Sequence, residues 1–215
     1  MSDSLKKTKS PKGELRWVNI AGEGKENLQG VPQFLASILL DDRVPEHAAY
    51  MDEIEAFWEE NRPKGLDEAK SLGFYPLTEK SDDGKKVPVE HMFYATYKTG
   101  ITFPDGSPKK VKTFNAKAVQ VDLGDQRVGN GSVGRIAGAM DIYTVKDTKG
   151  RIMQAGVTLY LDAIMLTKFV PYTGSSPFDD EDADTEDGWT GADADTGFEP
   201  EPDAPAATTK APPRI

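Results

Sequence analysis

Residues 128–169 read VGNGSVGRIAGAMDIYTVKDTKGRIMQAGVTLYLDAIMLTKF, and this stretch decides the fold. In its first half Ile136, Gly138, Met140 and Ile142 alternate with other residues and share one face. The second half alternates in the same way, which predicts two long strands that each bury one face. The polar segment KDTKGR between them carries three cations and predicts a turn. The stretch is therefore typical of an antiparallel hairpin.

Glycines are concentrated at the start of this hairpin, at positions 129, 131, 134 and 138. Glycine within a strand is typical of a sharp bend or a close approach of another backbone, and long bent strands suit a small barrel. The run GNGSVG also has the spacing of a dinucleotide-binding fingerprint. That motif requires a preceding strand and a following helix. The residues that follow are strand-like, so the sequence favours a structural role for these glycines.

The rest of the chain predicts further strands at 14–20, 31–40, 91–99 and 111–122, together with one main helix at 45–61. Pro45 suits the first helical turn, and Tyr50, Ile54, Phe57 and Trp58 form one apolar stripe. A short second helix is expected at 66–72. Aromatic-rich strands separated by turns favour a mainly β barrel or sandwich.

Composition divides the chain into three parts. Residues 1–13 are polar and basic and are expected to form a mobile arm, residues 14–173 form the folded domain, and residues 174–215 form a tail. The tail holds 12 of the 36 acidic residues and two of the 26 basic residues, so 24 of each remain before it. The net charge of −10 therefore lies in the tail, whose composition predicts disorder.

Several classes of function find no support in the sequence. There is no cysteine, no apolar run of the roughly 20 residues that a membrane span requires, and no secretory signal. His47 and His91 lie in different elements, and no carboxylates pair with a plausible acid–base partner. The acids of 182–186 lack the glycine and terminal glutamate of a calcium loop. We expect a non-enzymatic protein without metal or cofactor.

Aromatic and cationic residues recur together on the predicted strands. Single-stranded nucleic acid requires cations for its phosphates and aromatic faces on which its bases stack. The alternative for each ring is a place in the core, but Tyr143 and Tyr160 fall opposite the aliphatic faces of their strands. The candidate binding residues are Arg16, Trp17, Tyr94, Tyr97, Lys98, Lys109, Lys110, Lys112, Phe114, Lys117, Arg135, Tyr143, Lys146, Lys149, Arg151 and Tyr160.

The arrangement resembles the tailed-phage single-stranded DNA-binding proteins, which combine an OB-fold barrel with an acidic C-terminal tail. The resemblance covers most of residues 14–203. It rests on the glycine-rich turn at 128–132, AGVTLYLDAIML at 155–166, QFLASILLDD at 33–42 with the helix that follows, and the aromatic strand at 91–98. It implies a mainly β, OB-fold-like antiparallel barrel of about five to six strands with one main inserted helix.

The resemblance also implies partners. They are single-stranded DNA in the barrel groove and, through the tail, the phage DNA polymerase and the helicase or primase, in the cytoplasm of an infected bacterium. No membrane is involved, and a homodimer is left open. The expected tail contacts are Phe178, Asp179, Asp180, Glu181, Asp182, Trp189 and Phe198.

The sequence departs from the family at its end. The family tail commonly finishes with an acidic cluster and an aromatic residue, whereas this chain finishes KAPPRI, so an internal aromatic would have to substitute. Two alternatives stay open. One is a phage accessory or assembly module that binds no nucleic acid and uses the tail for docking, and the other is a metal-dependent nuclease. The choice between DNA and RNA also stays open.

Overall fold

The computed structural model describes residues 5–27, 29–81, 83–124 and 126–172. Within them the chain forms ten strands and one helix. The strands are β1 (Lys6–Lys9), β2 (Gly13–Asn19), β3 (Lys25–Glu26), β4 (Pro32–Asp41), β5 (Phe74–Lys80), β6 (Lys86–Gly100), β7 (Lys112–Phe114), β8 (Gln120–Val121), β9 (Ser132–Lys146) and β10 (Ile152–Lys168), and the helix is α1 (Pro45–Asn61).

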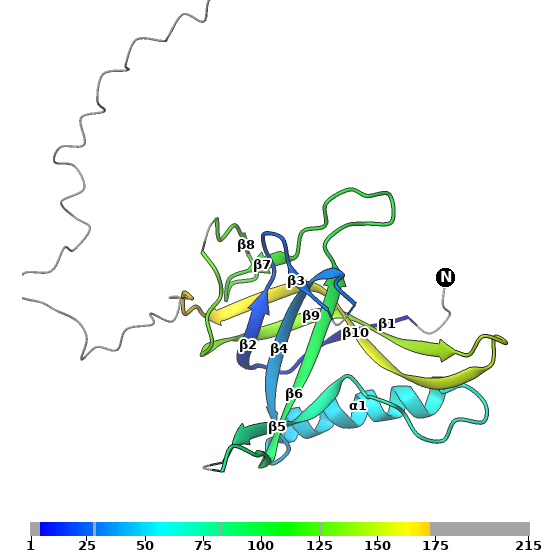
Figure 1. Ribbon diagram of the computed structural model, residues 1–215. Coiled ribbons are helices and arrows are strands. Elements are labelled where there is room, and N and C mark those ends of the chain that lie inside the picture. The colour runs from blue at the N-terminus through cyan, green and yellow to red at the C-terminus, as the bar shows by residue number, and fades with distance from the viewer. Residues whose placement is uncertain (1–4, 28, 82, 125, 173–215) are drawn as a thin grey trace, which may run out of the picture. The chain divides into compact units, whose positions relative to one another are not determined.

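Five strands close into a barrel. They pair in the order β2-β4-β6-β10-β9, and β9 returns to β2 through the register Gly13↔Gly134. Every pair is antiparallel except β6 with β10, where Leu159 lies opposite Tyr97 in a parallel register. This closed barrel confirms the predicted fold class, with α1 inserted between β4 and β5 (Figure 1).

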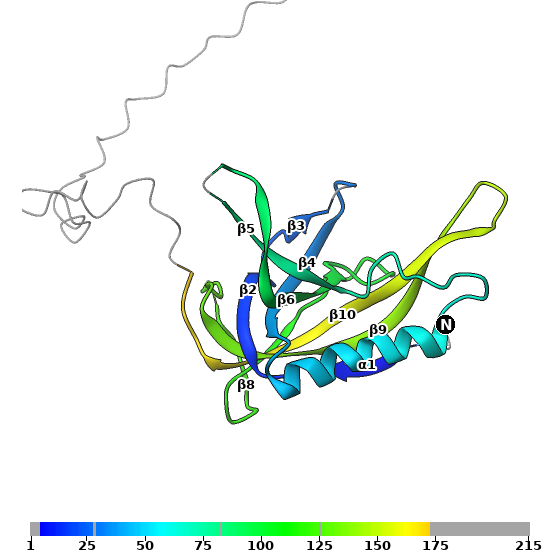
Figure 2. The same ribbon diagram turned by 90° about the horizontal axis from the view of Figure 1, so that it is seen from below.

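The β9–β10 hairpin is the longest pairing of the barrel and extends beyond it in both views (Figures 1 and 2). A Cβ atom placed on Gly138 would lie 1.7 Å from the carbonyl oxygen of Tyr160, and one on Gly134 would lie 2.1 Å from that of Met165. No side chain fits at either position. The close backbone approach predicted from these glycines is therefore confirmed, and it coincides with register shifts along β10 at Leu161/Ala163 and Leu166/Lys168.

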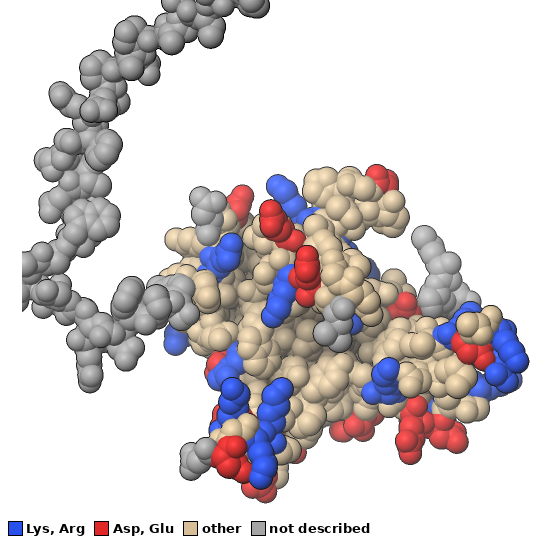
Figure 3. All heavy atoms as spheres, in the orientation of Figure 1, with Lys and Arg blue, Asp and Glu red and all other residues tan. Residues whose placement is uncertain are grey.

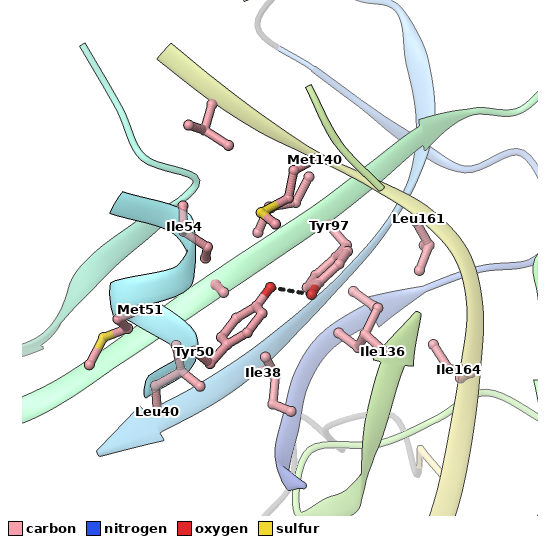
Figure 4. Close-up of a cluster of buried hydrophobic side chains, with 14 of the residues drawn as sticks. Ile38, Leu40, Tyr50, Met51, Ile54, Tyr97, Ile136, Met140, Leu161 and Ile164 are labelled. Atoms are coloured by element: carbon pink, nitrogen blue, oxygen red, sulfur yellow. Dashed lines mark hydrogen bonds between the residues drawn. The ribbon is translucent and has the colours of Figure 1, made fainter. Parts of the chain in front are cut away.

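Helix α1 supplies one wall of the core. It begins at Pro45, as predicted, and buries Tyr50, Met51, Ile54, Phe57 and Trp58. These side chains face the barrel interior, where Figure 4 shows aliphatic residues of β4, β9 and β10 around them. Burial of this apolar stripe against the strands is what holds the helix to the barrel.

A polar contact joins helix and barrel inside the core. The hydroxyl groups of Tyr50 on α1 and Tyr97 on β6 are hydrogen-bonded to each other inside the apolar cluster (Figure 4). Tyr97 is fully buried and Tyr50 nearly so. One hydroxyl donates to the other, which lowers the penalty of placing two polar groups in the apolar interior.

The structure differs from the sequence expectations at four places. Residues 6–9 of the expected mobile arm form β1, which pairs with β9 and buries Thr8, so the arm prediction is wrong there. Residues 66–72 form no helix. The strand expected at 111–122 is two short strands, β7 and β8, joined by a turn at Asn115. Strands β3 and β5 were not foreseen. The predicted tail, residues 174–215, lies outside the described residues.

The close approach at Gly138 predicts a steric test of barrel closure. In Gly138→Ala the new methyl group would meet a backbone carbonyl, which cannot rotate away, so β9 and β10 must separate. We expect a loss of at least about 3 kcal/mol in the free energy of unfolding, measured by urea denaturation. Gly100→Ala is the control, because its Cβ would approach nothing closer than 3.4 Å. Equal stability of the two variants would contradict the account of closure.

The tyrosine pair predicts loss of stability at high pH. Burial raises the pKa of Tyr50 to about 12, and burial together with Tyr50 raises the pKa of Tyr97 well above its ordinary value. A raised tyrosine pKa stabilises the fold fully below the unfolded pKa, about 10, and this contribution disappears as pH rises through the folded value. We therefore expect the urea midpoint to fall between about pH 10 and 12.

Variants at the pair test the assignment. Replacing both Tyr50 and Tyr97 by Phe should flatten the alkaline fall, whereas Tyr160→Phe, on the exposed side of β10, should leave it in place. The single change Tyr50→Phe should cost about 1–3 kcal/mol at neutral pH, because it removes the partner of the Tyr97 hydroxyl. An alkaline fall that persists unchanged in the double variant would assign it to other groups.

Candidate nucleic-acid interface

Three aromatic rings meet on the outside of the barrel. The ring of Trp17 on β2 lies edge-on to that of Tyr94 on β6, with centroids 5.1 Å apart, and Tyr75 on β5 lies 5.6 Å from Tyr94 on the other side. Trp17 is 44% exposed and Tyr75 is 41% exposed. Large aromatic side chains normally bury themselves, so a contiguous exposed group of this kind marks a surface that binds something. We call Trp17, Tyr75 and Tyr94 the ring cluster.

An irregularity in β2 places Trp17 in this cluster. The pairing of β2 with β4 shifts register between Arg16 and Asn19, and Trp17 there has a φ of 52°. Non-glycine residues seldom adopt positive φ, and such a bulge re-aims the side chain relative to its neighbours. The Trp17 N–H, freed from the ladder, donates to Oδ1 of Asn130 at 3.1 Å. The glycine-rich turn before β9 thus holds the backbone of Trp17 in its unusual conformation.

Tyr143 extends the cluster along β9. It pairs with Gly156 on β10, and a Cβ atom at 156 would lie 2.8 Å from the Tyr143 ring. The ring therefore lies across a position that only glycine can occupy. Partial burial raises the pKa of the Tyr143 hydroxyl, and the charge of Tyr75 raises it further. The hydroxyl of Tyr75 accepts a hydrogen bond of 2.8 Å from Ser71.

Cations flank these rings. Lys98 on β6 is exposed and lies beside Tyr160 of β10 in the parallel register, and Tyr160 is 39% exposed. Lys146, Lys149 and Arg151 occupy the tip of the β9–β10 hairpin, where Asp147 holds Arg151 at 2.9 Å. Figure 3 shows Lys and Arg gathered at this hairpin and near the end of β5 and β6, with mostly uncharged surface between them.

The structure brings together part of the predicted site. Trp17, Tyr94, Lys98, Tyr143 and Tyr160 lie on the outer side of the barrel strands, with the hairpin cations nearby. A second group lies elsewhere. Lys109, Lys110 and Lys112 line a cavity at one end of the barrel, and Phe114 and Lys117 lie in the neighbouring β7–β8 unit.

Three predicted residues have other roles. Tyr97 is 0% exposed and belongs to the core, so its assignment as a binding residue is wrong. The reason is the strand period of two, which puts Tyr97 on the opposite face from Tyr94. Arg135 donates to the carbonyl oxygen of Ser10 at 3.2 Å and lies 4.0 Å from Glu46, and Arg16 pairs with Glu14 at 2.9 Å. The predicted tail residues lie outside the described part of the chain.

Tyr75 was missed by the sequence analysis. The sequence predicts a short helix at 66–72 just before it and no strand around it. Strand β5 nevertheless forms at an edge of the sheet, paired only with β6 in the described structure, where proline is tolerated. The available signal was the pair Phe74-Tyr75, whose alternate faces pack Phe74 against Phe93 and place Tyr75 against Tyr94.

Two further surveys cover the described residues only. No helix there is long and apolar enough to cross a membrane. No group of three or more His, Asp or Glu side chains there is arranged to hold a metal ion.

The closed five-stranded barrel, its strand order and the parallel β6–β10 pair fit an OB fold. Among solved structures the chain is similar to gp2.5, a single-stranded DNA-binding protein encoded by bacteriophage T7. The TM-score is 0.53 at 16% identity, over 90% of this chain and 98% of that one. At this identity the similarity shows a shared fold, and it agrees with the fold that the sequence resemblance implied.

Other comparisons add less. The single-stranded DNA-binding protein of bacteriophage Enc34, in complex with single-stranded DNA, gives a TM-score of 0.47 at 13% identity, over 78% of this chain and 89% of that one. No family model matches the chain. No curated protein matches its sequence.

Proposed function

We propose that this protein is a non-enzymatic single-stranded DNA-binding protein of phage replication, recombination and repair, acting in the cytoplasm of the infected host. The observation that carries the proposal is the ring cluster of Trp17, Tyr94 and Tyr75 on the outside of the closed barrel. The fold shared with gp2.5, which is described as a single-stranded DNA-binding protein, supports it.

The binding mode follows from the chemistry of the outer face. Bases stack on the exposed rings, and each stacked base contributes about 1–3 kcal/mol. Lys98 and the hairpin cations Lys146, Lys149 and Arg151 neutralise phosphates along the strand. Because every base has an aromatic face, binding tolerates many sequences, and because the cations displace counterions, it weakens with salt.

Local backbone geometry and hydrogen bonds hold the exposed rings of the candidate interface in place. Trp17 is fixed by its bulge and by Asn130, Tyr143 lies over Gly156, and Tyr75 is held by Ser71. Rings that are already oriented lose little conformational entropy when a base stacks on them, so most of the stacking energy contributes to affinity.

The acidic tail acts as a second ligand for the cationic surface. Its sequence supplies 12 carboxylates, which compete with DNA phosphates for the same lysines and arginines. The aromatic residues Phe178, Trp189 and Phe198 give partner proteins an apolar point of contact, and the phage polymerase and the helicase or primase are the partners we propose. A tail released by DNA is then available for these partners.

The aromatic residues provide the first test. Trp17→Ala, Tyr75→Ala and Tyr94→Ala should each weaken binding to an oligo-dT strand by roughly 5- to 100-fold, the equivalent of one lost stacking contact. Tyr143→Ala and Tyr160→Ala should weaken it in the same direction. The measurement is fluorescence anisotropy at fixed salt, with urea denaturation to confirm folding.

The matched control is Leu5→Ala, which removes an exposed apolar side chain, 60% accessible, from outside the ring cluster. Full affinity in this control and loss in the cluster variants would support the interface. Wild-type affinity in all the cluster variants would place the binding surface elsewhere, and no binding of oligo-dT by the intact protein would favour the accessory module.

Removal of residues 174–215 tests the role of the tail. The shortened protein should bind single strands more tightly than the intact chain at low salt, because the competing carboxylates are absent, and the two should converge as salt rises. A salt titration of both proteins measures this. A control with the tail acids replaced by Asn and Gln should behave like the deletion. Identical affinities at low salt would exclude competition.

A further inference from the structure

A cavity lies at one end of the barrel and is not used by the ring cluster. Its volume is about 950 Å³. Its apolar walls include Val18 and Ile20 at the end of β2, Phe34 of β4, Ile101 after β6, and Val121 and Leu123 near β8. We call it the barrel-end pocket. Its size is within the range of cavities that hold small ligands, and its walls suit a flat apolar group.

The rim of this pocket is positively charged. Lys109, Lys110, Lys112 and Arg127 line it, against the single acid Asp122 among its described residues. Within the described chain none of these four cations forms an ion pair with a carboxylate, in contrast to Arg16, Arg43 and Arg151. Lys109 is oriented by a hydrogen bond of 2.5 Å to Thr99 and by the Phe103 ring, 5.6 Å away.

The pocket is continuous with the candidate interface along two strands. On β2, Trp17 of the ring cluster is followed directly by Val18 and Asn19 on the pocket wall. On β6, Lys98 precedes Ile101 and Thr102, which also line the pocket. Only a few residues of β6 therefore separate Lys98 from the pocket. A DNA strand that leaves the ring cluster past Lys98 has a short path to it.

We propose that the barrel-end pocket binds one nucleotide of the single strand, with its base between the apolar walls and its phosphates on the lysines and arginine of the rim. The inference rests on the proposed function. An apolar cavity with a cationic rim matches the two halves of a nucleotide, and lysine contacts phosphate as a compact charge. A base held in a pocket, unlike one stacked on an open face, fixes the position of the strand along the barrel.

The test removes bases one at a time. The intact protein is titrated with the shortest oligo-dT that binds at full affinity, in versions with a single abasic site at each position. In the wild type, an abasic site at one position near an end should weaken binding by about tenfold, because the pocket loses its base. In Val121→Trp, where the indole fills the pocket, the same abasic site should change affinity by less than about twofold.

Matched variants separate pocket filling from misfolding and from general charge. Val119→Trp adds the same ring two residues away in the sequence, but Val119 is 57% exposed and does not line the pocket, so the abasic effect should persist. Lys112→Glu should weaken binding and reduce the abasic effect without changing the cavity walls. Lys64→Glu makes the same charge change at an exposed position remote in sequence from the rim and should keep the abasic effect.

The possible results distinguish the pocket proposal from the proposed function. An abasic effect at one position that is lost in Val121→Trp and kept in Val119→Trp supports the pocket. Equal abasic effects in those two variants, with the wild type still binding the intact strand, overturn the pocket and leave the proposed function standing. Saturation of the pocket by free dTMP, followed by NMR shifts, without any positional effect in the strand would assign it to free nucleotides and overturn the proposal. Failure to bind any oligonucleotide would overturn both.

Discussion

The backbones of β9 and β10 approach so closely at Gly134 and Gly138 that side chains are excluded there, and the barrel can close because of it. The two strands bend and shift register around these contacts, which brings β9 to β2 and β10 to β6. Closure then divides each strand into an inner and an outer face. The inner faces meet α1 in one apolar core, and the outer faces carry the rings and cations of the candidate interface.

The division between faces explains how neighbouring tyrosines acquire opposite roles. Tyr94 and Tyr97 are separated by three positions on β6, so one points outward to Trp17 and the other inward to Tyr50. The inward hydroxyl needs a partner and has one on the helix. The outward ring needs none and remains available. The hydrogen bond between Tyr97 and Tyr50 ties β6 to the helix, so the outward rings stand on a rigid strand.

Much of the fold could be predicted from the sequence because its signals are local. The alternation in 128–169, the glycines and the apolar stripe of α1 each depend on residues that are close together in the sequence. The parts of the fold that the sequence did not predict depend on pairing with strands that are distant in the sequence. Strand β1 reads as a basic arm until β9 is present beside it, and Tyr75 reads as a loop residue until β6 pairs with β5. Trp17 was identified as a candidate, but its positive φ depends on Asn130 and is invisible in the sequence.

The pairing of the first strands with β9 has a consequence for how the protein folds. Ser10 accepts and donates hydrogen bonds at Ile136, 126 residues later, and β2 pairs with β9 over a similar separation. A ribosome releases β1 and β2 long before β9 exists, so β1 lacks its partner strand and β2 has only β4 beside it until most of the domain has emerged. Closure of the barrel is therefore a late event in folding, and the unpaired edges of these early strands are exposed to unwanted association before it. Lysines placed on β1 keep that waiting edge charged and soluble.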